Sequence, residues 1–237
     1  MKIVLFGHGK MGQLIEKLAV EASHEVVLVV DESNRDAISL ADLQLADVAI
    51  EFTMPEAAPG NIRFCADAGL PIVVGTTGWY HHFDELSAYV HEKGSAMLPA
   101  TNFSLGVNLF FAMTERLGAL MQPYGQYQAR IEETHHVHKK DAPSGTAITA
   151  AERLLSQWTH AVSWSLDGEQ PHTLPVIAHR IDEVPGTHEV IFSNAIDEIR
   201  LTHTAFNREG FAAGALYAAQ WLIGKKGVFS MRDVLGV

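Results

Sequence analysis

Cysteine is almost absent from this sequence, since Cys65 is the single one among 237 residues. One cysteine excludes an internal disulfide and a metal site built from thiolates alone. No apolar run approaches the ~20 residues needed to cross a bilayer. The first residues enter a glycine-rich loop at once, without the apolar segment of a signal peptide. We therefore expect a cytoplasmic protein of one or two domains with no membrane partner.

Positive charge is also scarce. The chain has 17 Lys and Arg against 28 Asp and Glu, for a formal net charge of −11. Nucleic-acid-binding proteins usually carry a basic face, so no nucleic-acid partner is expected. A local basic pocket for an anionic ligand is still compatible with this charge, and its candidate residues are Arg130, Lys139, Lys140 and Arg180.

The first hundred residues alternate short apolar runs with amphipathic segments. The pattern predicts strands at 2–6, 25–30, 47–52, 71–74 and 95–98. Between the first two, residues 10–22 place Met11, Leu14, Ile15 and Leu18 on one face of a helix. Strands that alternate with helices predict an α/β fold with a doubly wound parallel sheet of Rossmann type.

The pattern changes after about residue 103. It predicts helices at 105–121 and 143–158, and strands at 129–133, 174–182, 187–194 and 197–204. This mixture indicates a second domain of α+β type. Residues 210–223 form an alanine-rich apolar helix that the pattern alone assigns to neither domain.

A glycine motif lies between the first predicted strand and helix. It consists of Gly7, His8, Gly9, Lys10, Met11 and Gly12. Its spacing suits a tight turn, close approach of backbone to a pyrophosphate, and close packing of helix on strand. Asp31 ends the second strand, where an acid can bond the adenosine ribose. The motif predicts a dinucleotide site; the alternative is a glycine turn without a ligand.

Three further strand-end turns are expected to line the nicotinamide half of that site, because ligands bind beyond the carboxyl ends of parallel strands. Ordinary turn chemistry is the alternative. The turns are Phe52-Thr53, Gly75-Thr76-Thr77 and Ala100-Thr101-Asn102-Phe103. Asp31 opposes a 2′-phosphate and favours NADH, whereas Ser33, Asn34 and Arg35 could hold that phosphate. The expected cofactor is therefore NADH, NADPH or both.

Imidazole and ammonium groups gather in one segment. His135, His136, His138, Lys139, Lys140 and Asp141 lie within seven positions. Pro143 is expected in the first turn of the next helix. The N–H groups and hydroxyls of Ser144, Gly145 and Thr146 would then form a carboxylate site at the positive helix end.

Other interpretations of this segment remain open. His and Lys can exchange protons near neutrality, but Lys139 could instead form a Schiff base, and the whole segment could be a solvated loop. A metal site is disfavoured, because no zinc-like His pair one helical turn apart adjoins a Cys or Glu ligand. No metal is expected.

Residues 133–147 have the pattern Glu-x-His-His-x-x-Lys-x-Asp-Ala-Pro-Ser-Gly-Thr-Ala. This pattern resembles the signature of the 4-hydroxy-tetrahydrodipicolinate (dihydrodipicolinate) reductase family. Further similarity lies in Glu51-Phe52-Thr53-x-Pro55-Glu56, Gly75-Thr76-Thr77-Gly78, Asn102-Phe103-Ser104-x-Gly106-Val107-Asn108 and Met231-Arg232-Asp233-Val234-Leu235. Together these matches span nearly the whole chain, and the 133–147 block is the specific one.

This resemblance implies roles and a domain plan. His135 and Lys139 match the acid/base pair; His136, Gly145 and Thr146 match substrate-binding positions; the glycine loop, Asp31 and the later turns match the dinucleotide site. Residues 1–103 and 206–237 would form the dinucleotide-binding domain, completed by the C-terminal helix, and 104–205 the substrate-binding domain that assembles a homotetramer.

The implied reaction is NAD(P)H-dependent reduction of a cyclic imine dicarboxylate to tetrahydrodipicolinate in lysine and diaminopimelate biosynthesis. Hydride would reach ring C4, and Lys139 would protonate the resulting enamine carbon, while His135 would position or relay that proton. Two rival hypotheses are another Rossmann amino-acid dehydrogenase of aspartate or homoserine type, and a catalytically inactive nucleotide sensor.

Overall fold

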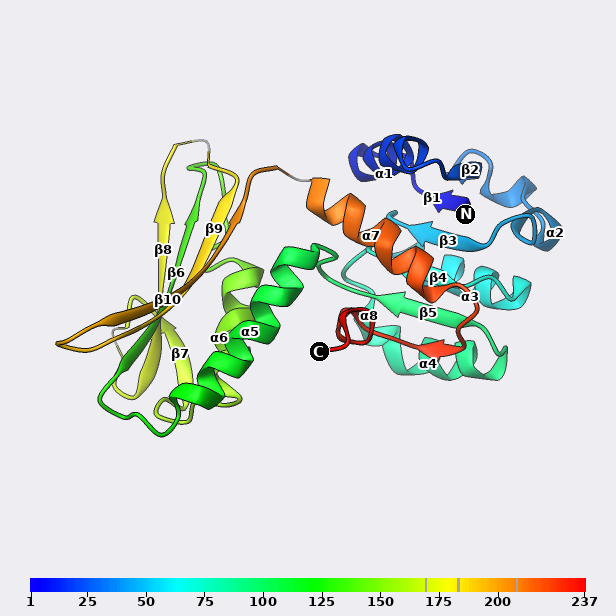
Figure 1. Cartoon of the computed structure of the whole chain (residues 1–237). Coiled ribbons are helices and arrows are strands. Elements are labelled where there is room, and N and C mark those ends of the chain that lie inside the picture. The colour runs from blue at the N-terminus through cyan, green and yellow to red at the C-terminus, as the bar shows by residue number, and fades with distance from the viewer. Residues whose placement is uncertain (169, 183, 208) are drawn as a thin grey trace. The chain divides into compact units, whose positions relative to one another are not determined.

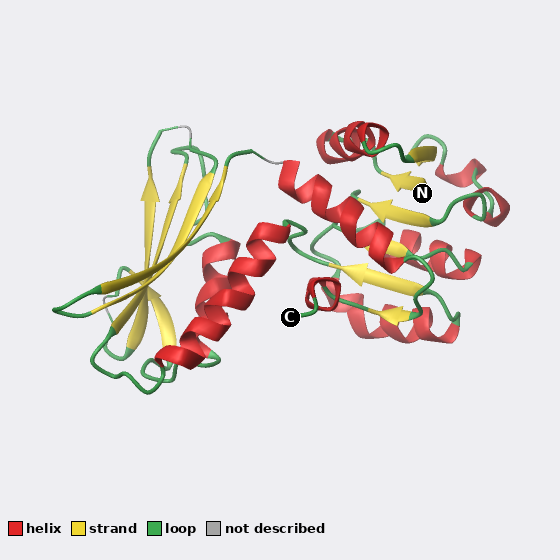
Figure 2. Ribbon diagram, in the orientation of Figure 1, coloured by secondary structure: helices red, strands yellow, loops and turns green. Residues whose placement is uncertain are grey.

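The computed structural model describes residues 1–168, 170–182, 184–207 and 209–237. The chain forms two compact units, one of Met1–Leu105 with Glu209–Val237 and one of Gly106–Arg208 (Figure 1). Each unit has its own sheet and its own helices (Figure 2). Within the described residues, no helix combines the length and apolarity needed to span a membrane.

The first unit is built on a parallel six-stranded sheet in the order β11-β5-β4-β3-β1-β2. Its strands are β1 (Lys2–Phe6), β2 (Glu25–Val30), β3 (Val48–Glu51), β4 (Ile72–Val74), β5 (Ala96–Pro99) and β11 (Gly227–Val228). Its helices are α1 (Lys10–Glu21), α2 (Leu40–Leu43), α3 (Ala58–Ala68), α4 (Phe83–Glu92), α7 (Glu209–Leu222) and α8 (Met231–Leu235), with 3-10 turns at Arg35–Ala37 and Tyr80–His82. The predicted doubly wound α/β fold is confirmed.

Alternate residues of each strand pack into two separate cores, because neighbouring side chains of a strand point to opposite faces. Ile3 and Leu5 of β1 join α1 and α7 in one core, whereas Val4 and Phe6 join α3 and α4 in the other. Strands buried on both faces explain why these segments are continuous apolar runs.

Helix α7 belongs to this first unit, although it follows the second unit in sequence. Its small residues allow a close approach to the turn after β5. A Cβ on Gly214 would lie 1.8 Å from the carbonyl oxygen of Phe103. This contact joins segments that are far apart in sequence, so periodicity within α7 could not predict it.

The second unit is a mixed five-stranded sheet in the order β10-β9-β6-β8-β7. Its strands are β6 (Gln128–His135), β7 (Ser163–Leu166), β8 (Thr173–Arg180), β9 (Gly186–Ser193) and β10 (Glu198–Ala205), and its helices are α5 (Leu105–Met121) and α6 (Gly145–Leu155). Strand β6 pairs parallel with β8 and antiparallel with β9. Side chains of α5 and α6 share one core with alternate residues of β6, β8 and β9.

The opposite face of this sheet is polar. Arg130 donates to Glu132 at 2.7 Å and to Glu198 at 3.1 Å. Arg200 donates to Glu198 at 2.8 Å and to Glu189 at 3.0 Å. These ion pairs link strands β6, β9 and β10 where none of the described helices packs.

The structure corrects several boundaries. Pro143 does not lie in the first helical turn, because Ser144 is the N-cap of α6 and the helix begins at Gly145. Strand β6 continues past the predicted end at 133, so His135 is a strand residue and not part of a loop. Strands β7 and β11 were not predicted; both are short, and β11 has only two residues.

Candidate active site

The turns predicted to bind a cofactor lie side by side at the carboxyl edge of the parallel sheet. Each residue just past a strand bonds the neighbouring strand: Gly7 N–H to Val30 O at 2.8 Å, Phe52 N–H to Phe6 O at 2.9 Å, Gly75 N–H to Glu51 O at 2.8 Å and Ala100 N–H to Val74 O at 3.1 Å. The structure thus brings these predicted residues together along one edge, where ligands of such sheets bind.

The glycine loop has the geometry of an anion cradle. Gly7 has φ of +89°, and a Cβ there would lie 2.2 Å from Phe52 O. A Cβ on Gly12 would lie 2.1 Å from Gly7 O, so helix and loop touch through bare backbone. Gly9 is the N-cap of α1, and no side chain forms a capping hydrogen bond there. A Cβ on Gly9 would meet nothing within 4 Å. The first-turn N–H groups of α1 are therefore accessible to a phosphate.

The side chains of the remaining cofactor candidates divide into packed and exposed groups. The Phe52 ring fills the place of a Gly75 side chain and lies 6.0 Å from the Phe103 ring. Thr53 N–H donates to Thr76 Oγ1 at 2.8 Å, which joins two turns. Among the predicted cofactor residues Gly12, Thr76 and Phe103 are buried, and the others are at least partly accessible.

Two acids shape this edge. Glu51 is fully buried and accepts hydrogen bonds from the N–H and hydroxyl of Thr53; burial raises its pKa. Asp31 is exposed at the end of β2 and accepts from the hydroxyl of Ser33 at 2.6 Å and from its N–H at 2.8 Å. These bonds lower the pKa of Asp31. Both bonds from Ser33 are made to Oδ1.

In the second unit, Glu133 forms the centre of a buried polar cluster. Its carboxylate accepts from Ser144 N–H at 3.0 and 3.1 Å and from Arg180 Nη2 at 3.1 Å. Its Oε2 lies 3.4 Å from His135 Nδ1 and 3.7 Å from His188 Nε2. The two imidazole rings meet edge to face at 5.0 Å.

This environment fixes the charges in the cluster. Burial raises the pKa of Glu133, but the nearby His135 imidazole and the hydrogen bonds from Ser144 and Arg180 outweigh burial and bring it to about 2. Burial, helped by the charge of His135, lowers the pKa of His188 to about 4. At neutral pH Glu133 is therefore a carboxylate and His188 is a neutral imidazole.

The loop between β6 and α6 carries Lys139 next to this cluster. Lys139 Nζ donates to Asp141 Oδ1 at 2.9 Å, and Arg180 donates to the Asp141 carbonyl at 2.6 Å. The bond from Lys139 lowers the pKa of Asp141, and the Lys139 charge contributes to the low pKa of His188. The charges of Lys139 and His135 thus both act on His188.

The predicted carboxylate-binding helix end divides into a cap and an open part. Ala147 N–H donates to the buried Ser144 hydroxyl at 3.2 Å, and Ser144 Oγ lies 3.2 Å from His188 Nε2. The Ser144 side chain is therefore part of the scaffold. Gly145 is exposed, and a Cβ there would meet nothing within 4 Å. Thr146 and His136 are partly accessible.

Residue-type reasoning from the sequence missed three members of this cluster. Glu133 was part of the signature but was given no role, Arg180 was only a general basic candidate, and His188 was not singled out. The glycine at position 186 leaves room for His135, because its φ is +152° and a Cβ there would lie 2.9 Å from His135 Nε2. The contacts themselves join β6, β8 and β9, which pattern alone does not align.

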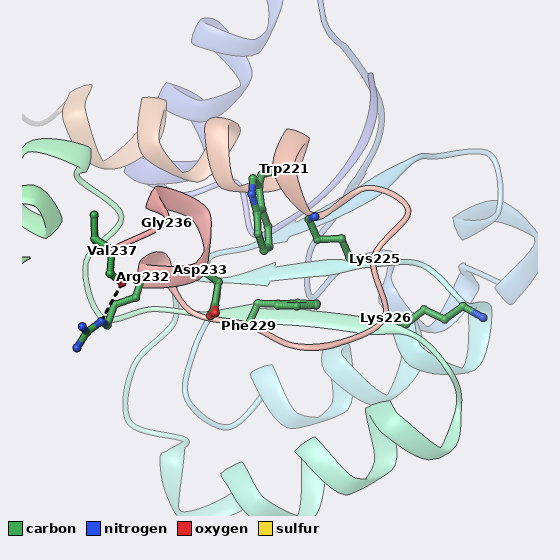
Figure 3. A pocket seen from close by; sticks show the side chains of 8 residues that line it. All are labelled: Trp221, Lys225, Lys226, Phe229, Arg232, Asp233, Gly236 and Val237. Atoms are coloured by element: carbon green, nitrogen blue, oxygen red, sulfur yellow. Dashed lines mark hydrogen bonds between the residues drawn. The ribbon is translucent and has the colours of Figure 1, made fainter.

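A separate cavity of about 590 Å³ lies in the first unit near its C-terminal segment (Figure 3). Trp221 and Phe229 meet edge to face there, and Lys225 Nζ lies 4.0 Å from the centre of the Trp221 ring. Lys226, Arg232, Asp233, Gly236 and Val237 complete its lining. It contains none of the predicted site residues, so it is not the site described above.

Comparisons with known proteins cover nearly the whole chain. Residues 1–103 match the model of the N-terminal part of dihydrodipicolinate reductase, and residues 106–235 match that of the C-terminal part. A protein of Christiangramia forsetii named 4-hydroxy-tetrahydrodipicolinate reductase is 44% identical over 99% of this chain and 98% of its own length. One of the same name from Archaeoglobus fulgidus is 35% identical over 99% of this chain and 100% of its own.

Solved structures show the same fold. A dipicolinate-bound dihydrodipicolinate reductase from Paenisporosarcina sp. TG-14 superposes with a TM-score of 0.80 at 20% identity, over 97% of both chains. An amine dehydrogenase from Mycobacterium smegmatis superposes with a TM-score of 0.58 at 11% identity, over 97% of this chain and 94% of its own.

Proposed function

The chain belongs to the dihydrodipicolinate reductase family, and from that premise we propose that it is a 4-hydroxy-tetrahydrodipicolinate reductase. It reduces the cyclic imine dicarboxylate to tetrahydrodipicolinate with a pyridine nucleotide, in lysine and diaminopimelate biosynthesis. The observation that carries the proposal is the convergence of Lys139, His135 and the open end of α6 within one unit.

Each group has a distinct task in this reaction. The two substrate carboxylates need N–H donors, which Gly145 and Thr146 supply at a positive helix end. Lys139 gives a proton to the enamine carbon that results from reduction at C4. His135, with Glu133 at 3.4 Å, positions or relays that proton. Arg180 and Ser144 hold Glu133 in place.

The cofactor site is proposed at the carboxyl edge of the first unit. The open Gly9 and the uncapped start of α1 fit a pyrophosphate. A bound nicotinamide supplies the hydride. Ser33, a candidate for holding a 2′-phosphate, bonds Asp31 instead, and the Arg35 guanidinium lies 3.8 Å over the Phe64 ring. These contacts favour NADH, with NADPH as a second substrate.

Replacing Asp31 by alanine is expected to weaken NADH binding more than NADPH binding, because the acid bonds a ribose hydroxyl and opposes a 2′-phosphate. Isothermal calorimetry with both nucleotides measures the difference. Glu32→Ala is the matched control, since it removes an exposed carboxylate one residue away. Equal losses for both nucleotides would place Asp31 away from the ribose.

Pyridine-2,6-dicarboxylate is expected to inhibit in competition with the imine substrate, because it presents the same ring and both carboxylates. Thr146→Val removes a hydroxyl with little change in volume and should weaken this inhibitor by about 1–3 kcal/mol. Gly145→Val should weaken it more, because its side chain occupies the open space a ligand needs. Inhibition constants are measured in metal-free buffer, because the inhibitor also chelates divalent cations.

Thr149→Val, one turn further along α6, is the control for this series and should leave inhibition unchanged. NADH affinity should survive all three substitutions. The substrate pocket would lie elsewhere if pyridine-2,6-dicarboxylate competed with NADH instead of the imine, or if neither Gly145→Val nor Thr146→Val changed its inhibition constant.

The second unit is also proposed to assemble a homotetramer. Its polar sheet face carries half-buried ion pairs without a covering helix among the described residues. Its edge strand β10 exposes Ile199, and Phe206 beyond it is 87% exposed. An exposed edge strand beside an open sheet face is suited to pairing with further copies of the chain.

One assay separates this function from its rivals. NADH oxidation is followed in a coupled reaction in which dihydrodipicolinate synthase supplies the imine. A reductase oxidises NADH only when the synthase is active. An aspartate- or homoserine-type dehydrogenase would respond to those substrates instead, and an inactive nucleotide sensor would bind NADH without oxidising it.

A further inference from the structure

We propose that Glu133, His135 and His188 form a binding site for a divalent transition-metal ion of the Zn²⁺ type, and that occupation of this site inhibits the enzyme. The candidate ligand atoms of the three residues lie within 4.8 Å of one another. Glu133 Oε2 is 3.4 Å from His135 Nδ1 and 3.7 Å from His188 Nε2. Tetrahedral zinc with bonds of about 2.0–2.2 Å separates its ligands by about 3.4 Å.

The donor chemistry also suits such an ion. Two imidazoles and one carboxylate are a common zinc ligand set, in which the fourth position remains open. Metal binding requires a deprotonated carboxylate and neutral imidazole. His135 Nδ1 is buried and has no hydrogen-bond partner among the described residues. A metal ion would give this nitrogen a partner.

The existing contacts of Glu133 are compatible with a metal ion on Oε2. Ser144 N–H reaches both oxygens, Oε1 at 3.0 Å and Oε2 at 3.1 Å, and carboxylates that bind metal ions commonly accept such hydrogen bonds as well. Arg180 bonds Oε1, the other oxygen of the carboxylate, at 3.1 Å. It can therefore stay in place and orient the carboxylate, as second-layer partners of metal ligands do. Ser144 Oγ lies 3.2 Å from His188 Nε2. The Ser144 oxygen also accepts from Ala147 N–H, which holds the oxygen in place. The Ser144 hydroxyl hydrogen can still rotate away from His188 Nε2 when that nitrogen binds a metal.

The site differs from the surface histidine pairs. His136 and His138 lie on the loop with ring centres 6.2 Å apart, and His81 and His82 are adjacent in sequence. The proposed ligands come from β6 and β9, so they are held by the sheet. This placement also explains why sequence spacing indicated no metal. The inhibition rests on the proposed role of His135, whereas the metal site itself does not.

The test measures metal binding without substrate or cofactor. Chelator-treated, full-length protein is titrated with Zn²⁺ by calorimetry and with Co²⁺ by visible absorption, which reports four-coordinate geometry. His188→Asn should weaken Zn²⁺ binding at least tenfold and remove the Co²⁺ bands. His179→Asn is the matched control, because His179 also lies near a carboxylate, 3.4 Å from Glu132 Oε2, but outside the cluster. The His179→Asn variant should bind Zn²⁺ and Co²⁺ as the parent does.

Three results would overturn the proposal. They are no Zn²⁺ binding by the parent protein, Zn²⁺ binding by His188→Asn equal to that of the parent, and loss of Zn²⁺ binding only in the double variant His136→Asn/His138→Asn. If His188→Asn fails to fold, crystals of the parent grown with Zn²⁺ decide the question. An anomalous peak within bonding distance of the three ligands supports the site, and peaks only elsewhere reject it. In the coupled assay, Zn²⁺ should inhibit the parent reversibly, with activity restored by EDTA.

Discussion

Replacing Lys139 by alanine is expected to lower turnover by roughly 10²–10⁴-fold, while NADH binding barely changes. The substitution removes the ammonium that the proposed mechanism uses to protonate the substrate carbon. It leaves the cofactor site intact, because every predicted cofactor residue lies in the other unit. Steady-state kinetics in the coupled assay measure turnover, and calorimetry measures NADH affinity.

Two variants separate proton donation from local structure. Lys140→Ala removes an exposed cation next to Lys139 and should have little effect. Asp141→Asn weakens the 2.9 Å ion pair but keeps the ammonium of Lys139, so turnover should fall far less than in Lys139→Ala. If Lys139→Ala turns over at a near-normal rate, Lys139 is not the proton donor.

The agreement between sequence and structure is best where one local segment decides the outcome. The glycine motif occupies six consecutive positions at the junction of β1 and α1. The tight turn at Gly7 and the close contact of Gly12 with the Gly7 carbonyl are those the spacing indicated. Strand β1 follows its apolar run because its residues from Ile3 to Phe6 are buried on both faces of the sheet. The fold class and the family signature could therefore be obtained from the sequence alone.

The parts that sequence could not supply depend on contacts between distant segments. The close packing of α7 against the Phe103 turn joins residues far apart in the chain. Pro143 suits the first turn of a helix because it lacks an N–H. The helix instead starts where Ser144 can cap it and where the Ser144 N–H can bond buried Glu133. That bond depends on the position of β6, which helix propensity does not include.

The same reasoning applies to His188. In sequence it is an alternating residue of a strand, with nothing to distinguish it from a core position. In the sheet it lies between His135, Glu133 and Ser144, and this environment lowers its pKa to about 4. The site thus depends on β6, β8, β9 and the start of α6 together. The charge states of Glu133 and His188 follow from the packing of these four elements.

The low pKa of His188 predicts how stability depends on pH. A pKa below the ordinary 6.5 means that the folded state binds this proton more weakly than the unfolded state. His188 therefore contributes its full stability above pH 6.5, and that contribution is lost as the pH falls toward 4. The shift corresponds to about 3 kcal/mol. Glu133, with its pKa near 2, keeps its contribution until the pH falls below the ordinary 4.5.

Urea denaturation from pH 7.5 to 4.5, at constant protein concentration and ionic strength and without metal, measures this dependence. The free energy of unfolding of the parent should fall steeply over this range, and His188→Gln should flatten the curve by about 3 kcal/mol. His179→Gln is the control and should keep the parent slope, because its side chain is 42% exposed. Equal slopes for the parent and His188→Gln would show that His188 titrates alike in the folded and unfolded states. In that case the buried cluster does not hold it neutral.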